Sequence, residues 1–101
     1  MVQIRSGSIG GAREEVRLRV EETGLGFEKA RDLAKRKAQE ICSEAMLLSW
    51  NNTETGEYYP AFECGRIGRP AWVVYADARG ADLTIDINDG RYTFMFLKLA
   101  R

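Results

Sequence analysis

Hydrophobic and charged residues alternate strictly between Glu15 and Glu21. Alternation with a period of two places the apolar side chains on one face of a β-strand and the charged side chains on the other. We therefore predict a strand that buries one of its faces in this segment. The apolar residues of the strand are Val16, Leu18 and Val20.

After a turn at 23–26, apolar residues recur every three or four positions, which predicts a helix from about Phe27 to about Ser43. Because alanine is small, a stripe rich in alanine allows the helix axis to lie close to a sheet. The large apolar side chains of the helix are those of Phe27, Leu33 and Ile41. The apolar stripe consists of Phe27, Ala30, Ala34, Ala38, Ile41 and Ala45.

The segment 45–50 fits two periods. Met46, Leu48 and Trp50 alternate as they would in a strand, whereas Ala45 and Leu48 also continue the helical stripe. We predict a strand here, and the alternative is that the helix continues.

Turn-forming residues are spread throughout residues 51–70, which predicts a long loop. Loops of this length in small domains are usually functional or disordered. Three aromatic residues, Tyr58, Tyr59 and Phe62, argue against disorder.

Residues 71–76 are apolar on both faces, a pattern typical of a central strand. Two further strands, 82–88 and 91–99, flank the dipeptide Asp89-Gly90. This dipeptide favours a type I′ hairpin turn, because both central residues of that turn have positive φ. The predicted register sets Ile87 opposite Tyr92, Ile85 opposite Phe94 and Leu83 opposite Phe96.

These elements predict an α+β fold. A strand, a helix and a strand are followed by a three-strand antiparallel meander, and the main helix packs on one face of a mostly antiparallel sheet. We predict a flexible lead-in over residues 1–13, which contain three glycines, and a single domain over 14–101. Val2 and Ile4 offer an additional edge strand as an alternative.

One helix covers only one face of such a sheet. Four apolar residues would then lie on the opposite face, and this is too much contiguous apolar surface to leave in water. Either the 51–70 loop folds over this face or a second copy of the chain covers it. We predict a homodimer, because two-fold pairing is the commonest way to bury such a patch. The predicted interface residues are Val73, Tyr75, Met95 and Leu97.

The charges of the 101-residue chain balance, with 15 Lys and Arg against 15 Asp and Glu. A chain without net charge has no overall field to steer it toward nucleic acid or an anionic membrane. Histidine is absent, which excludes histidine-dependent catalysis and histidine ligation of zinc or haem. No segment approaches the ~20 apolar residues of a membrane span, and the N-terminus lacks a signal peptide. We predict a soluble cytoplasmic domain without a cofactor.

Aromatic, acidic, thiol and arginine side chains are concentrated between residues 58 and 69. Aromatic rings give contact area at low entropic cost, and a guanidinium group forks onto a carboxylate or phosphate. We predict that this segment binds a small ligand or a partner protein. The alternative is that the aromatic rings only cap the sheet. The candidate binding residues are Tyr58, Tyr59, Phe62, Cys64, Arg66 and Arg69.

Other chemistry is less favoured. Catalysis at Cys64 requires a thiol pKa lowered by Arg66 or Arg69, and there is no histidine to act as base. Cys42 is predicted to be a small residue of the core. Both cysteines are predicted to be reduced, and the alternative is a disulfide bond between Cys42 and Cys64.

Two charged groups are interpreted as solvent-facing. The basic residues of the helix alternate with acidic ones and surround the helix, so a solvated face is preferred to nucleic-acid binding. These basic residues are Lys29, Arg31, Lys35, Arg36 and Lys37. Four aspartates lack the spacing of an EF-hand, so no metal site is predicted. They are Asp77, Asp82, Asp86 and Asp89.

Three segments in order, 45–50, 62–64 and 81–91, carry a family resemblance. These segments and their order along the chain resemble those of a small family of uncharacterised α+β proteins of anaerobic prokaryotes, a domain of unknown function. The resemblance covers roughly residues 27–97 and implies a compact α+β fold in the cytoplasm. It implies no activity, so no catalytic residue is carried over. The sequence Asn51-Asn52-Thr53-Glu54-Thr55-Gly56 departs from the carboxylate-rich loop of the family.

The sequence therefore favours a non-catalytic module that binds a ligand or partner through the 58–69 segment and the aromatic edge of the sheet. The alternative is a small enzyme or ligand carrier that uses Cys64 and Arg66 in a loop pocket.

Overall fold

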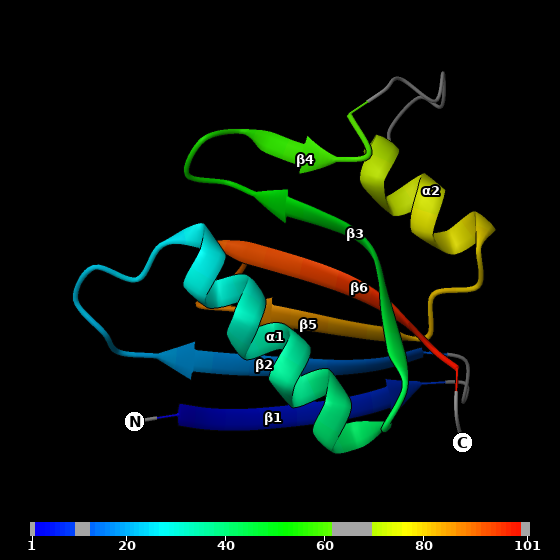
Figure 1. Ribbon diagram of the computed structural model, residues 1–101, viewed down its shortest axis with the longest axis horizontal. Helices are drawn as coiled ribbons and strands as arrows, with labels where there is room; N and C mark the ends of the chain where they lie inside the picture. Colours follow the sequence, from blue (N-terminus) through cyan, green and yellow to red (C-terminus); the bar gives the residue numbers. More distant parts are fainter. Residues whose placement is uncertain (1, 10–12, 62–69, 100–101) are drawn as a thin grey trace.

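The computed structural model describes residues 2–9, 13–61 and 70–99. In these residues a six-stranded sheet has the strand order β1-β2-β5-β6-β3-β4. Figure 1 shows α1 lying across one face of the sheet, and α2 near β3 and β4. The elements are β1 (Val2–Ile9), β2 (Arg13–Val20), α1 (Phe27–Ile41), β3 (Ala45–Asn52), β4 (Glu57–Tyr59), α2 (Ala71–Ala78), β5 (Leu83–Ile87) and β6 (Tyr92–Lys98).

The sheet is mixed. Only β2 and β5 run parallel, and the other paired strands are antiparallel. The predicted α+β class, with the main helix on one face of a mostly antiparallel sheet, is confirmed.

The two N-terminal strands form one long antiparallel pair. In β2 the predicted alternation is present, because Val16 and Leu18 are buried while Arg17 between them is exposed. β1 pairs with β2 along its whole length, from Val2 opposite Val20 to Ile9 opposite Arg13. Residues 2–9 thus form the edge strand that was the alternative to a flexible lead-in.

α1 packs through the predicted alanine stripe. Ala30, Ala34 and Ala38 are fully buried against the sheet. A methyl group is the only side chain at each of these positions, so the helix approaches the sheet closely and the large residues of β5 and β6 fill the core. The main core cluster joins these alanines to Val16, Leu18, Leu25, Leu83, Ile85, Ile87, Tyr92, Phe94 and Phe96.

The β5–β6 hairpin has the predicted register, with Ile87 opposite Tyr92, Ile85 opposite Phe94 and Leu83 opposite Phe96. Asp89 and Gly90 have φ values of 54° and 86°, as a type I′ turn requires. The Arg91 N–H donates to the Asn88 carbonyl at 3.2 Å and closes the turn. The hairpin prediction is confirmed.

β3 confirms the predicted strand at 45–50 and pairs antiparallel with β6. Its register shifts between Leu47 and Ser49, which marks a β-bulge. Residues 51–70 are not one loop, because β3 continues to Asn52 and Glu57–Tyr59 returns as the short strand β4.

Residues 71–76 form the start of α2, so the predicted central strand is wrong. A short apolar run does not distinguish a strand from a buried helix by its period alone. The helix ends at Ala78 and Arg79 is its C-cap. The next residue, Gly80, has a φ of +83°. The Ala81 N–H donates to the Ala76 carbonyl and the Gly80 N–H donates to the Asp77 carbonyl, both at 3.0 Å. These two bonds form a Schellman motif.

α2 covers part of the face that we expected to be bare. Ala76 packs against Leu48, Ala81 and Met95 in a second core cluster, and Met95 is only 3% exposed in the single chain. Met95 alternates with Phe94 and Phe96 along β6, so this cluster lies on the face opposite α1. The expectation that one helix leaves the whole opposite face uncovered is therefore corrected. Partly buried around the cluster are Trp72, Val73, Tyr75 and Leu97.

Candidate functional site

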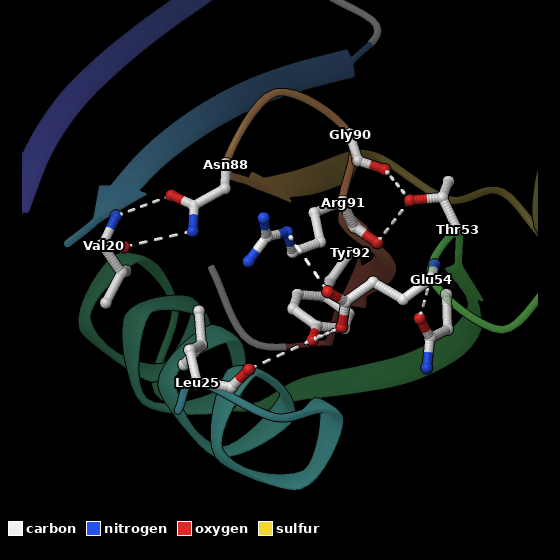
Figure 2. Close-up of polar contacts among 9 residues, drawn as sticks. Val20, Leu25, Thr53, Glu54, Asn88, Gly90, Arg91 and Tyr92 are labelled. Atoms are coloured by element: carbon white, nitrogen blue, oxygen red, sulfur yellow. Dashed lines mark hydrogen bonds and ion pairs between the residues drawn. The ribbon is translucent and has the colours of Figure 1, made fainter. Parts of the chain in front are cut away.

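Four strands begin or end at one row across the sheet, or within two residues of it. We call this end of the sheet the hairpin end. The register places Leu18, Ile87, Tyr92 and Asn52 in this row, one residue from each strand. Because β2, β3 and β5 end there or within two residues of it, the turns that follow them meet. Figure 2 shows the polar contacts that join these turns.

Asn88 ties the hairpin turn to the end of β2. Its side-chain Oδ1 accepts from the Val20 N–H at 2.8 Å, and its Nδ2 donates to the Val20 carbonyl at 3.1 Å. Its backbone N–H donates to the Leu18 carbonyl at 2.9 Å. Asn88 holds a φ of +55°, a conformation that asparagine tolerates better than most residues. The side-chain amide of Asn88 therefore bonds to the Val20 backbone as a residue of a neighbouring strand would.

A second set of contacts ties the turn after β3 to the same hairpin. The Thr53 N–H donates to the Arg91 carbonyl at 3.0 Å. The Thr53 hydroxyl lies 3.0 Å from the Arg91 carbonyl oxygen and 3.2 Å from that of Gly90. The Glu54 N–H donates to the Asn52 side-chain oxygen at 3.0 Å. The backbone at Glu54 is thus tied both to β3 and to the β5–β6 turn.

A buried tyrosine holds the Glu54 carboxylate. The fully buried Tyr92 hydroxyl lies within hydrogen-bonding distance of Glu54 Oε1 and is 3.3 Å from the Leu25 carbonyl oxygen. Burial raises the pKa of the Tyr92 phenol, and the hydrogen bond to the Glu54 carboxylate raises this pKa further. The phenol therefore stays protonated and acts as a donor. The other oxygen of Glu54 is 3.6 Å from Arg91 Nε.

An open hollow of about 340 Å³ lies beside Arg91. Arg19 and Asp89, two of its lining residues, form an ion pair of 3.3 Å. The residues that line the hollow are Arg19, Val20, Glu21, Asn88, Asp89 and Arg91. Two guanidinium groups and two carboxylates therefore share a mostly polar site.

A row of aromatic rings runs from the core to the edge strand β4. The Phe27 ring centroid lies 4.4 Å from that of Trp50 and 6.1 Å from that of Tyr92. Trp50 stacks with Tyr59, with centroids 6.4 Å apart and an interplanar angle of 19°. Tyr59 is 51% exposed. We call Phe27, Trp50 and Tyr59 the aromatic edge.

Only part of the predicted binding segment lies in the described residues. Tyr58 and Tyr59 belong to β4, where Tyr58 is half-buried and Tyr59 is exposed. The other four predicted binding residues, Phe62, Cys64, Arg66 and Arg69, lie outside the described residues, and so does any site that needs them. Cys42 is buried, as predicted, and its thiol lies 3.1 Å from the Glu44 carbonyl oxygen.

Sequence reasoning missed the polar residues of the hairpin end. Tyr92 was expected only as an apolar partner of Ile87, yet a tyrosine on a buried strand face usually needs a hydrogen-bond partner. That rule would have directed attention to a nearby acceptor. Asn88 directly precedes the Asp-Gly turn. Asparagine tolerates the left-handed conformation and bonds to nearby backbone, and its place before this turn was the available signal. Nothing in the spacing of Glu54 and Arg91 indicates that they meet.

The charged groups interpreted as solvent-facing take part in local contacts. Lys37 pairs with Glu40 at 3.2 Å on α1, and Lys29 pairs with Glu22. Asp86 Oδ1 accepts from the Gly90 N–H at 2.6 Å. Within the described ranges, no three acidic or cysteine side chains come together as metal ligands do. The helices described here also lack the length and apolar character that crossing a membrane requires.

Comparison with known proteins places the chain in a family. Residues 13–96 match the sequence model of a family described as a domain of unknown function, DUF5619. The chain belongs to this family. The predicted resemblance to a family of unknown function is thereby confirmed, and family membership assigns the chain no activity.

The chain is also similar to a solved structure. The chain is similar to AF1514, a novel protein from Archeoglobus fulgidus DSM 4304, with 30% sequence identity and a TM-score of 0.73. The similarity covers 86% of this chain and 95% of that chain. A comparison with curated proteins gives no match.

Proposed function

We propose that this member of the DUF5619 family is a non-catalytic binding module that engages a partner protein or ligand through its aromatic edge. The observation that carries the proposal is the exposure of Tyr59, whose ring is nearly parallel to that of Trp50 with the two centroids 6.4 Å apart. Rings in such a position are held in place before binding, so little rotamer entropy is lost on contact. Tyrosine and tryptophan also dominate the binding energy of many interfaces.

The hairpin end supports binding in preference to catalysis. The Tyr92 phenol is buried, holds its proton and already donates to Glu54 or Leu25. The Cys42 thiol is buried against the Glu44 carbonyl. Each of these groups thus has a structural role in the described part of the chain.

Native mass spectrometry of freshly purified protein tests the proposal. We expect a bound ligand or partner on the wild-type chain and on Tyr58→Ala, and its loss from Tyr59→Ala. Tyr58 is the matched control because it is the neighbouring tyrosine of β4 and is not stacked on Trp50. Equal occupancy of Tyr59→Ala and Tyr58→Ala would contradict a role for the aromatic edge.

The alternative is a small enzyme or ligand carrier that uses Cys64 and Arg66. A reactive thiol is a thiolate, whose pKa lies well below the unperturbed value of about 8.5. Alkylation of Cys64 followed as a function of pH separates the two functions. A thiol that reacts well below pH 8 favours the enzyme, and a slow or inert thiol favours the binding module.

We further propose that the chain is a cytoplasmic homodimer and that its family belongs to anaerobic prokaryotes. The surface beside α2 supports the dimer. Val73, Tyr75 and Leu97 remain partly buried there. Met46 lies opposite Leu97 and is 45% exposed, and Leu99, two residues farther along, is 53% exposed. A second copy would remove this apolar surface from water.

A further inference from the structure

We infer that the hollow at the hairpin end binds a small monocarboxylate, which accepts a pair of hydrogen bonds from the terminal nitrogens of Arg91. This site lies apart from the aromatic edge and goes beyond the proposed function. Its elements are a positioned guanidinium, free donor atoms and a hollow of suitable size and charge.

The Arg91 guanidinium is held by a chain of contacts that begins in the core. Tyr92 is fully buried in β6, and its hydroxyl contacts Glu54 Oε1. Glu54 Oε2 lies 3.6 Å from Arg91 Nε. The backbone of Arg91 is held as well, because its carbonyl accepts from the Thr53 N–H. The contact with Glu54 favours one orientation of the guanidinium before a ligand binds, which lowers the entropic cost of binding.

The contact with Glu54 leaves the other side of the guanidinium open. Among the described residues, Arg91 Nε has an acidic partner, whereas the two terminal nitrogens have none. Figure 2 shows these terminal nitrogens directed toward Asn88, away from the Glu54 carboxylate. Asn88 and Arg91 both line the hollow, and the Arg91 side chain is 47% exposed. A guanidinium fork in this arrangement matches the two oxygens of a carboxylate.

The neighbouring residues select among anions. Asn88 does not compete for the fork, because both polar atoms of its side chain are bonded to Val20. Glu21 and Asp89 also line the hollow, and Asp89 already pairs with Arg19. These carboxylates repel a dianion more strongly than a monoanion. A ligand with one carboxylate, including an amino acid whose ammonium group faces Glu21, therefore fits better than inorganic phosphate.

The size of the hollow agrees with such a ligand. Its volume of about 340 Å³ lies near the lower end of the range for small-molecule sites, roughly 300 to 1,000 Å³. Because the hollow is open to solvent, the binding is expected to be weak, with a Kd on the order of 1 mM.

Titration followed by ¹H–¹⁵N correlation spectra tests the inference on the full chain. The probes are acetate, glycine and phosphate at constant pH and ionic strength. We expect acetate and glycine to shift the Arg91 Nε–H signal and the amide signals of Asn88 to Tyr92, with saturation. Phosphate should bind at least threefold more weakly. Absence of saturable shifts with acetate and glycine, or tighter binding of phosphate, would overturn the inference.

Two variants test the geometry. Arg91→Lys keeps the charge and removes the fork, so we expect acetate binding to weaken about tenfold. Tyr92→Phe keeps the ring and removes the hydroxyl that holds Glu54, so binding should weaken several-fold while the fold, checked in the same spectra, is retained. The matched control is Arg36→Lys on the exposed face of α1, which should bind as the wild type does. Wild-type affinity in Arg91→Lys, or an equal loss in Arg36→Lys, would show that the guanidinium of Arg91 is not the receptor.

Discussion

At the scale of single residues, the hairpin end depends on polar side chains that replace missing backbone partners. β2 stops at Val20, where the next strand residue would normally continue the ladder, and the Asn88 amide supplies both a donor and an acceptor instead. Tyr92 performs a similar task for Glu54 from inside the core. These contacts make a turn region that is fixed by side chains.

Replacing Asn88 separates the two contributions of this residue. We expect Asn88→Ala to lower the free energy of unfolding by about 2 kcal/mol, because two hydrogen bonds to Val20 are lost and alanine is strained at positive φ. Asn88→Gly relieves the strain and should cost roughly half as much. Urea denaturation of the three proteins measures both values. A change below about 0.5 kcal/mol in Asn88→Ala, the scatter typical of surface substitutions, would contradict this role.

Asp86 gives the fold a pH dependence of defined sign. Burial raises the pKa of this carboxyl above its ordinary value of 3.8, opposed by the Gly90 N–H and by Arg17. The folded chain thus binds the proton more tightly than the unfolded chain does. The contribution of Asp86 to stability is therefore present at low pH and is lost as the pH rises from about 3.8 through the folded pKa.

Asp86→Asn should remove this dependence. The variant keeps an oxygen that accepts from Gly90 and carries no charge to desolvate, so at pH 7 we expect its melting temperature to equal or exceed that of the wild type. Thermal melts between pH 3 and pH 7 measure the slope. Asp32→Asn, at an exposed residue of α1, is the control and should leave the slope unchanged. An unchanged slope in Asp86→Asn would contradict the assignment.

At the scale of elements, the predictable parts are those in which local period and turn chemistry agree. The β5–β6 register follows from the alternation of both strands and from the Asp-Gly turn, and α1 follows from its alanine stripe. α2 was missed because Trp72, Val73 and Tyr75 belong to a short apolar run, and such a run fits the period of a strand and that of a helix equally well. Its C-terminal glycine, Gly80, was the stop signal that favoured a helix. The contacts that join the turns of the hairpin end link residues 37 or more positions apart, which no local pattern reveals.

The Schellman motif predicts a difference between two glycines. Gly80 has a φ of +83° and open space around it, so Gly80→Ala is expected to cost about 1 kcal/mol through backbone strain alone. Gly26, the N-cap of α1, also has open space but lies in the extended region, so Gly26→Ala should cost only roughly 0.5 kcal/mol, through capping and without backbone strain. Chemical denaturation of both variants makes the comparison. Equal costs would contradict the account of how α2 ends.

At the scale of the whole molecule, the two helices divide the faces of the sheet between them. α1 covers one face and α2 covers the opposite face near β3 and β6, so the folded chain buries more of its apolar surface than a one-helix arrangement allows. Among the described residues, Met46 and Leu99 remain exposed on the side of the sheet that carries α2. This is the surface that the proposed homodimer uses.

Light scattering coupled to size-exclusion chromatography tests the dimer. We expect the wild-type chain to elute at twice the mass of one chain. Met46→Glu should shift it to one chain, because a charge on this half-exposed residue is tolerated in the monomer and is unfavourable inside an apolar interface. Tyr59→Ala, on a different surface, should leave the mass unchanged. A monomeric wild type, or a dimer that survives in Met46→Glu, would contradict the proposed interface.

The strand order also has a consequence for how the chain is made. Among the described strands, β5 and β6 come after the other four in the chain, yet they lie between the β1–β2 pair and the β3–β4 pair. The two earlier pairs do not pair with each other, and only the β5–β6 hairpin joins them into one sheet. The centre of the sheet therefore forms only after β6 has been translated. Until then a nascent chain exposes the inner edges of two separate ribbons, a form that chaperones and proteases recognise.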